Sequence, residues 1–153
     1  MAKKLKIFLS YSHKDEEMKN QLDIFLVNLK RSDSIEVWQD RELAGGDEWD
    51  DKIKNELTTS DIILLLVSAD FNASDYIWKK ELAVAMQRHE RGEARVIPVI
   101  LRNCEWQDMP YAKLQALPTG GKPITVYADK DEAYTDIAKG IRKVVEFMSR
   151  NAG

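Results

Sequence analysis

Five short apolar runs divide the chain and alternate with longer segments of helical periodicity. The runs span residues 6–10, 35–38, 62–68, 96–101 and 124–127. The third and fourth are continuously apolar rather than alternating, which is typical of strands buried on both faces of a sheet. Strands interleaved with helices favour parallel pairing. The pattern therefore predicts an α/β fold with a central five-stranded parallel sheet flanked by helices, in which Pro98 removes one backbone donor from the fourth strand.

Apolar residues at helical spacing predict four helices. They span residues 15–30, 48–58, 76–91 and 132–150. The first carries an apolar stripe that we interpret as core, formed by Leu22, Phe25, Leu26 and Leu29. The third carries a stripe formed by Trp78, Leu82, Ala85 and Met86. Residues 103–122 are rich in proline and glycine and predict a long loop with one short helical turn.

Composition and charge limit the class of protein. With 153 residues, 44% of them hydrophobic, we expect one domain over residues 1–150, cut from a longer multidomain protein. The net charge of -3 argues against a nucleic-acid partner. The apolar runs are far shorter than the roughly 20 residues that cross a bilayer, so no membrane partner is expected. A single cysteine, Cys104, and the absence of a signal-peptide pattern favour a cytoplasmic location.

Ligands of a parallel sheet bind beyond the carboxyl ends of its strands. Four segments follow those ends: residues 11–14, 39–47, 69–76 and the loop from residue 103 onward. No glycine-rich loop follows the first strand, which argues against a Walker or Rossmann phosphate site. A response-regulator receiver requires an acidic pair after the first strand and an aspartate ending the third. Here Asp15 and Asp70 lie beyond those strand ends, so the receiver is a weaker alternative.

Three motifs on this rim resemble the bacterial type of Toll/interleukin-1 receptor (TIR) domain. They are Ile7-Phe-Leu-Ser-Tyr-Ser-His-Lys-Asp-Glu16, Trp38-Gln-Asp-Arg-Glu-Leu-Ala-Gly-Gly-Asp-Glu-Trp49 and Ser68-Ala-Asp-Phe-Asn-Ala-Ser-Asp-Tyr-Ile-Trp-Lys-Lys-Glu-Leu82. The resemblance runs from about Lys6 to about Phe147. It implies a flavodoxin-like three-layer fold and, for the enzymes of the family, cleavage of NAD+ at the bond between nicotinamide and ribose.

Glu81 is the candidate catalytic residue, because it alone matches the glutamate that the family carries early in its third helix. Nicotinamide leaves as a neutral molecule and needs no general acid, unlike the leaving groups of most glycosidases. One carboxylate is therefore enough to stabilise the positive charge that grows on the ribose. The products would be nicotinamide and either ADP-ribose or a cyclic ADP-ribose. The competing interpretation makes Glu81 a solvated surface acid paired with Lys79 or Lys80.

Several aromatic and polar residues are candidates for substrate binding. Phe71, Tyr76 and Trp78 are placed to stack on nicotinamide or adenine. Trp78 has the alternative of packing between helix and sheet, and it stands three residues before Glu81, whereas the family often has tryptophan four before, where this chain has Ile77. The segment after the first strand adds Tyr11, Ser12 and His13.

The second motif resembles the BB loop, which in this family gates the site and contacts other subunits. Asp40 and Arg41 are candidates for ribose and phosphate contacts, or for a local ion pair. Leu43 and Trp49 are further candidates for substrate contact. The interaction loop itself consists of Ala44, Gly45 and Gly46, and its glycines permit a change of conformation.

The sequence predicts no metal site and no cofactor, with NAD+ as substrate. The resemblance implies assembly with other copies of the same domain as a homo-oligomer or filament, and a fused sensor domain outside this chain. It favours the effector of a bacterial anti-phage defence system, activated by self-assembly. The alternative is a non-catalytic TIR module that scaffolds signalling by homotypic assembly.

Overall fold

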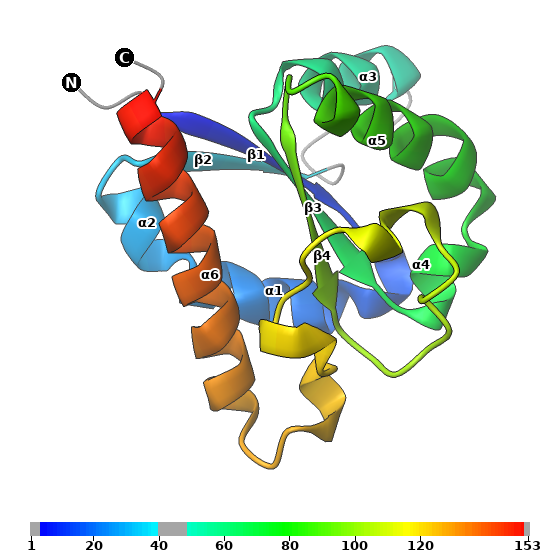
Figure 1. Ribbon diagram of the computed structural model, residues 1–153, viewed down its shortest axis with the longest axis vertical. Coiled ribbons are helices and arrows are strands. Elements are labelled where there is room, and N and C mark those ends of the chain that lie inside the picture. Colours follow the sequence, from blue (N-terminus) through cyan, green and yellow to red (C-terminus); the bar gives the residue numbers. More distant parts are fainter. Residues whose placement is uncertain (1–3, 40–48, 152–153) are drawn as a thin grey trace.

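The computed structural model describes residues 4–39 and 49–151 of the chain (Figure 1). Its sheet has four parallel strands in the order β2-β1-β3-β4. The strands are β1 (Leu5–Ser10), β2 (Ile35–Gln39), β3 (Ile62–Val67) and β4 (Arg95–Ile100). All six residues of β3 have 0% exposure, which confirms a central strand covered on both faces. The predicted α/β fold with a parallel sheet between helices is confirmed.

Helices cover both faces of the sheet. On one face lie α1 (Glu16–Phe25), α2 (Val27–Arg31) and α6 (Lys130–Asn151). On the other lie α3 (Trp49–Thr59), the π-helix η3 (Ile77–Leu82) and α5 (Ala83–Glu90). The short elements are η1 (His13–Asp15), α4 (Ala69–Ala73), η4 (Pro110–Lys113), η5 (Thr119–Gly121) and η6 (Ile124–Val126). The predicted loop at 103–122 is confirmed, with two short helical turns instead of one.

Side chains alternate across β1, and this alternation sets the two layers of core. Ile7 and Leu9 pack with α1 and α6, whereas Phe8 packs with α3 and α5. Ser10, two residues after Phe8, therefore faces the α3 and α5 side at the carboxyl end of the strand. The apolar stripe of the first helix is core as predicted, although the helix is divided at Leu26, whose φ of -92° and ψ of 0° leave the helical region.

The predicted fifth strand is wrong: Ile124–Val126 forms a 3₁₀ turn. Beside β4 the chain instead places one residue, Leu117, in an isolated bridge to Val99. The Leu117 N–H donates to the Pro98 carbonyl at 2.8 Å, and the Ile100 N–H donates to the Leu117 carbonyl at 2.8 Å. Pro98 has no N–H to offer at this edge, and Pro118 and Pro123 interrupt the partner segment. These missing donors limit pairing to a single bridge.

Leu117 is held at the sheet edge from the other side by α6. At Gly140 an added Cβ would lie 2.7 Å from the Leu117 Cδ2, which is closer than real Cβ contacts allow. Glycine at this helical position therefore leaves space for Leu117, the residue that forms the bridge at the edge of β4.

His89 covers the edge of β4 at another point. Its Nδ1 accepts a hydrogen bond from the Val96 N–H at 3.1 Å. Burial, followed by the charges of Arg95 and Lys113, lowers the pKa of His89. The neutral ring is the form that accepts this bond. The hydrogen bond between His89 and Val96 therefore contributes to stability above the ordinary histidine pKa of about 6.5. This contribution is lost as the pH falls below that value and the ring becomes protonated.

We expect the free energy of unfolding of the wild-type domain to fall more between pH values of about 7.5 and about 5 than that of His89→Asn. The asparagine keeps an acceptor oxygen but does not titrate, and His13 is present in both proteins. The excess loss should reach about 1 kcal/mol, the usual worth of one hydrogen bond. Urea denaturation at the two pH values measures it, and parallel losses in the two proteins would contradict the expectation.

None of the helices in the described part of the chain is long and apolar enough to cross a membrane.

Candidate active site

Glu81 lies in the interior, with 4% of its surface exposed. It belongs to η3, whose wider π turns direct Ile77, Glu81 and Leu82 toward the sheet. The interpretation of Glu81 as a solvated surface acid is therefore wrong. Single π turns inside helices are frequent at functional sites.

Ser10 is the partner that sequence reasoning missed. Its hydroxyl donates a hydrogen bond to Glu81 Oε1 at 2.6 Å, and the serine is 1% exposed. The bond joins the carboxyl end of β1 to η3 across 71 positions of sequence. The signal for it was the alternation of β1, which turns residue 10 toward the face that the third helix covers. A buried carboxylate held by a hydroxyl is oriented as well as desolvated.

The three candidate aromatic residues near Glu81 have different environments. Phe71 is 1% exposed and packs edge-on against Tyr111, with ring centroids 6.2 Å apart, so it belongs to the core. Tyr76 is half-buried. Trp78 is 47% exposed, so the interpretation that it packs between helix and sheet is wrong. Ile77 takes the inward position in its place, because the π turn shifts the helical register.

The three candidate binding residues that follow β1 lie in different environments. Tyr11 is 3% exposed and joins the core beside α1. Ser12 caps η1 by accepting a hydrogen bond from the Lys14 N–H. His13 is exposed on the rim, with its ring 6.0 Å from that of Tyr11. Of the three, His13 is the most accessible to a ligand.

The candidates of the second motif lie mostly outside the described residues. These are Asp40, Arg41, Leu43, Ala44, Gly45 and Gly46. Trp49 begins α3, and its side chain also lies outside the described part.

A partly buried polar cluster on the same rim was not predicted from the sequence. Asp15, 2% exposed, accepts a short hydrogen bond from the Ser68 hydroxyl. Arg102 Nη2 lies 2.9 Å from Asp15 Oδ1 and 2.5 Å from Asp70 Oδ2. The hydrogen bond with Asp70, followed by the charges of Asp15 and Asp70, raises the pKa of Arg102 above its ordinary value. The cluster ties η1 to the carboxyl ends of β3 and β4.

Lys19 of α1 is a buried cation at this rim, with 5% exposure. Its Nζ donates to the side-chain oxygen of Gln39 and lies 5.5 Å from the centre of the Tyr11 ring. Both contacts are to uncharged groups, and within residues 4–39 and 49–151 no carboxylate forms an ion pair with Lys19. The ammonium therefore loses hydration without gaining a counter-charge from the described residues.

We expect Lys19→Met to raise the free energy of unfolding by about 1 kcal/mol, because it removes this desolvation cost and keeps the aliphatic packing. Thermal unfolding should show a midpoint about 2–4 °C higher. Lys14→Met, at an exposed position nearby, is the matched control and should change stability by less than about 0.5 kcal/mol. A loss of stability in Lys19→Met would show that the contacts with Gln39 and Tyr11 outweigh desolvation.

Cys104 is partly buried, and burial raises the pKa of its thiol, which disfavours the reactive thiolate. In the described part of the chain no group of three histidine, cysteine or acidic side chains is placed to hold a metal ion.

Comparison with known proteins identifies the family. Residues 7–138 match the model of the TIR domain, and the chain belongs to this family. It is 49% identical over 146 residues to the uncharacterized protein y4lF of Sinorhizobium fredii (strain NBRC 101917 / NGR234), an alignment that covers 95% of this chain and 45% of that protein. The chain thus spans about half the length of that relative.

A solved structure shares the fold. The crystal structure of a prokaryotic SEFIR domain superimposes with a TM-score of 0.54 at 18% identity, covering 88% of this chain and 90% of that one. The resemblance to a TIR domain that the sequence motifs indicated is confirmed.

Proposed function

We propose that this TIR domain cleaves NAD+ between nicotinamide and ribose, with Glu81 as the catalytic carboxylate. The observation that supports the proposal most is the buried Glu81, oriented by Ser10 in a π turn at the carboxyl rim of the sheet. A solvated structural glutamate requires neither burial nor an orienting hydroxyl. TIR domains include NAD+ hydrolases, which makes this placement informative.

The chemistry that Glu81 would perform is electrostatic. As the C1′–N bond breaks, nicotinamide takes the bonding electron pair and leaves as a neutral molecule, and positive charge develops on the ribose. A carboxylate in a poorly solvated setting stabilises that charge more strongly than one in water. Attack of water on C1′ then gives ADP-ribose and a proton, whereas attack by a ring nitrogen of the adenine gives a cyclic ADP-ribose.

The proposal includes activation by self-assembly. We infer that several copies of the domain associate in a homo-oligomer or filament and that the BB loop contributes to the contacts. The greater length of the y4lF relative supports a fused sensor domain. The cellular setting that we propose is the bacterial cytoplasm, with the domain acting as the effector of an anti-phage defence system.

The second candidate function is a non-catalytic scaffold. One observation favours it: Trp78, 47% exposed, is a large aromatic side chain on the surface of η3, and such residues are enriched among the strong contacts of protein interfaces. Scaffolding and catalysis are compatible if assembly completes the site.

The test is nicotinamide release from NAD+ by the purified domain over a wide range of protein concentration. Cleavage that rises faster than linearly with protein supports an enzyme gated by assembly. No cleavage at the highest concentration, or after fusion to an oligomerising partner, would favour the scaffold.

A further inference from the structure

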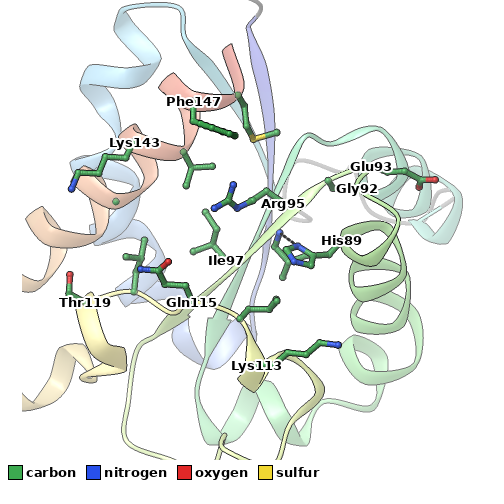
Figure 2. Close-up of a pocket in the computed structure, with 17 residues that line it drawn as sticks. His89, Gly92, Glu93, Arg95, Ile97, Lys113, Gln115, Thr119, Lys143 and Phe147 are labelled. Atoms are coloured by element: carbon green, nitrogen blue, oxygen red, sulfur yellow. Dashed lines mark hydrogen bonds between the residues drawn. The ribbon is translucent and has the colours of Figure 1, made fainter. Parts of the chain in front are cut away.

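A groove runs along the open edge of β4, between α5 on one side and α6 on the other (Figure 2). Its volume is about 890 Å³. It follows the beginning of the strand, at Arg95, Val96 and Ile97, whereas Ser10 and the Ser68 cluster lie at the carboxyl ends of the strands. The groove is therefore separate from the candidate active site.

The backbone of β4 presents hydrogen-bonding groups to this groove. Arg95 and Leu101 donate to the carbonyls of Asp61 and Val67 on the β3 side, both at 2.9 Å. Because successive residues of a strand turn their N–H and C=O groups to opposite sides, Val96 turns both of its groups to the open edge. His89 takes the Val96 N–H, and the Val96 carbonyl remains as an acceptor facing the groove. Water can donate to this carbonyl, so a partner that displaces the water must carry a donor of its own.

The walls of the groove are apolar in their upper part. The lining includes Val144, Phe147 and Met148 of α6 together with Val96 and Ile97 of β4. Phe147 is 52% exposed, which is high for so large an apolar side chain. Contact with apolar side chains of a partner would remove this surface from water.

The charges around the groove are predominantly positive. Arg95 projects from β4 into the groove, while Lys113 and Lys143 stand at its two rims (Figure 2). Within the described residues neither Arg95 nor Lys143 forms an ion pair, and Lys113 pairs only at the exposed rim, with Glu90 at 3.2 Å. Among the described residues that line the groove, Glu93 is the one acid, and it points away from the groove (Figure 2). Its Oε1 lies 3.7 Å from the Nε of Arg88.

We propose that this groove binds an extended acidic segment of a partner protein, with apolar side chains alternating between its carboxylates. An extended chain supplies the N–H that the Val96 carbonyl can accept, along with apolar side chains for Phe147. Its carboxylates match Arg95 and Lys143. A free phosphate would satisfy the cations but has neither the backbone donor nor the apolar surface.

The probe is a fluorescein-labelled peptide of alternating aspartate and valine, compared with the same peptide carrying lysine for aspartate. Fluorescence polarisation should show at least about tenfold tighter binding of the acidic peptide. The double variant Arg95→Glu/Lys143→Glu should weaken that binding by about tenfold or more. Amide NMR shifts on binding should concentrate at residues 94–97, and the pKa of His89 should rise as carboxylates approach it.

The matched control is Lys139→Glu/Arg142→Glu, which makes the same change in net charge at exposed positions of α6 outside the groove. It should retain the affinity of the wild type. Equal binding of both peptides, or equal weakening by both double variants, would overturn the proposal. Two further results would overturn it, because each assigns the groove to a different occupant. One is self-association of the domain that Arg95→Glu/Lys143→Glu abolishes and the control variant does not. The other is tighter binding of a single-stranded oligonucleotide than of the acidic peptide. No readout involves NAD+, so the outcome is independent of the proposed function.

Discussion

Glu81→Gln is expected to lower the rate of nicotinamide release by about 10²–10³-fold, the usual effect of removing one group that stabilises transition-state charge. Glutamine has nearly the same shape, and its amide oxygen can still accept the hydrogen bond from Ser10. The variant should therefore fold and assemble as the wild type does. Steady-state kinetics should show the loss in kcat, with KM changed far less, because the charge develops only as the bond breaks.

Glu90→Gln is the matched control for this change. Glu90 ends α5 in the same helical segment, but its carboxylate is exposed and, among residues 4–39 and 49–151, pairs only with Lys113. Cleavage by Glu90→Gln should equal that of the wild type. If Glu81→Gln kept full activity, Glu81 would not be the catalytic group. If Glu81→Gln instead lost both its activity and the circular dichroism spectrum of a folded protein, Ser10→Ala would be measured next. That variant keeps the carboxylate and removes only the hydrogen bond that orients it.

The second large effect concerns stability. Asp15→Ala is expected to lower the free energy of unfolding by about 2–3 kcal/mol, because it removes a charged acceptor from the buried Ser68 hydroxyl and from Arg102. For a domain of this size the midpoint of thermal unfolding should fall by about 5–10 °C. Differential scanning calorimetry measures both quantities.

Asp70→Ala provides an internal comparison, because Asp70 pairs with the same guanidinium at 2.5 Å but its side chain is 38% exposed. Its loss should cost less than about 1 kcal/mol, the range of solvated ion pairs. Equal losses of unfolding free energy in Asp15→Ala and Asp70→Ala would show that the burial of Asp15 does not strengthen its contacts. The contacts of Arg102 would then account for the stability of the cluster.

Much of the fold was predictable because it rests on local patterns. The continuous apolar runs of β3 and β4 and the stripe at Leu22, Leu26 and Leu29 gave the strands and the core face of the first helical segment. The rim of the candidate site followed from the same strand ends. Glu81 was selected through the family motif, and its catalytic role stays a proposal that its burial supports.

The features that escaped prediction depend on long-range contacts or on small changes of helical register. Ser10 and Asp15 meet their partners 71 and 53 positions away, and no local pattern encodes such a pairing. The π turn of η3 rotated Trp78 to the surface and Ile77 inward, against the stripe expected of an ordinary α-helix. The predicted fifth strand does not form because prolines lack the N–H groups that pairing requires: Pro98 at the edge of β4, and Pro118 and Pro123 in the facing segment.

The glycine in the middle of α6 has a consequence for attempts to stabilise the domain. By helix propensity alone, alanine in place of Gly140 looks like a gain of about 1 kcal/mol. The new methyl group would collide with Leu117, which lies where a Cβ has no room. The Leu117 side chain must therefore repack before alanine fits, and the cost of this repacking opposes the gain in helix propensity, so propensity alone does not give the sign of the change in stability at this position.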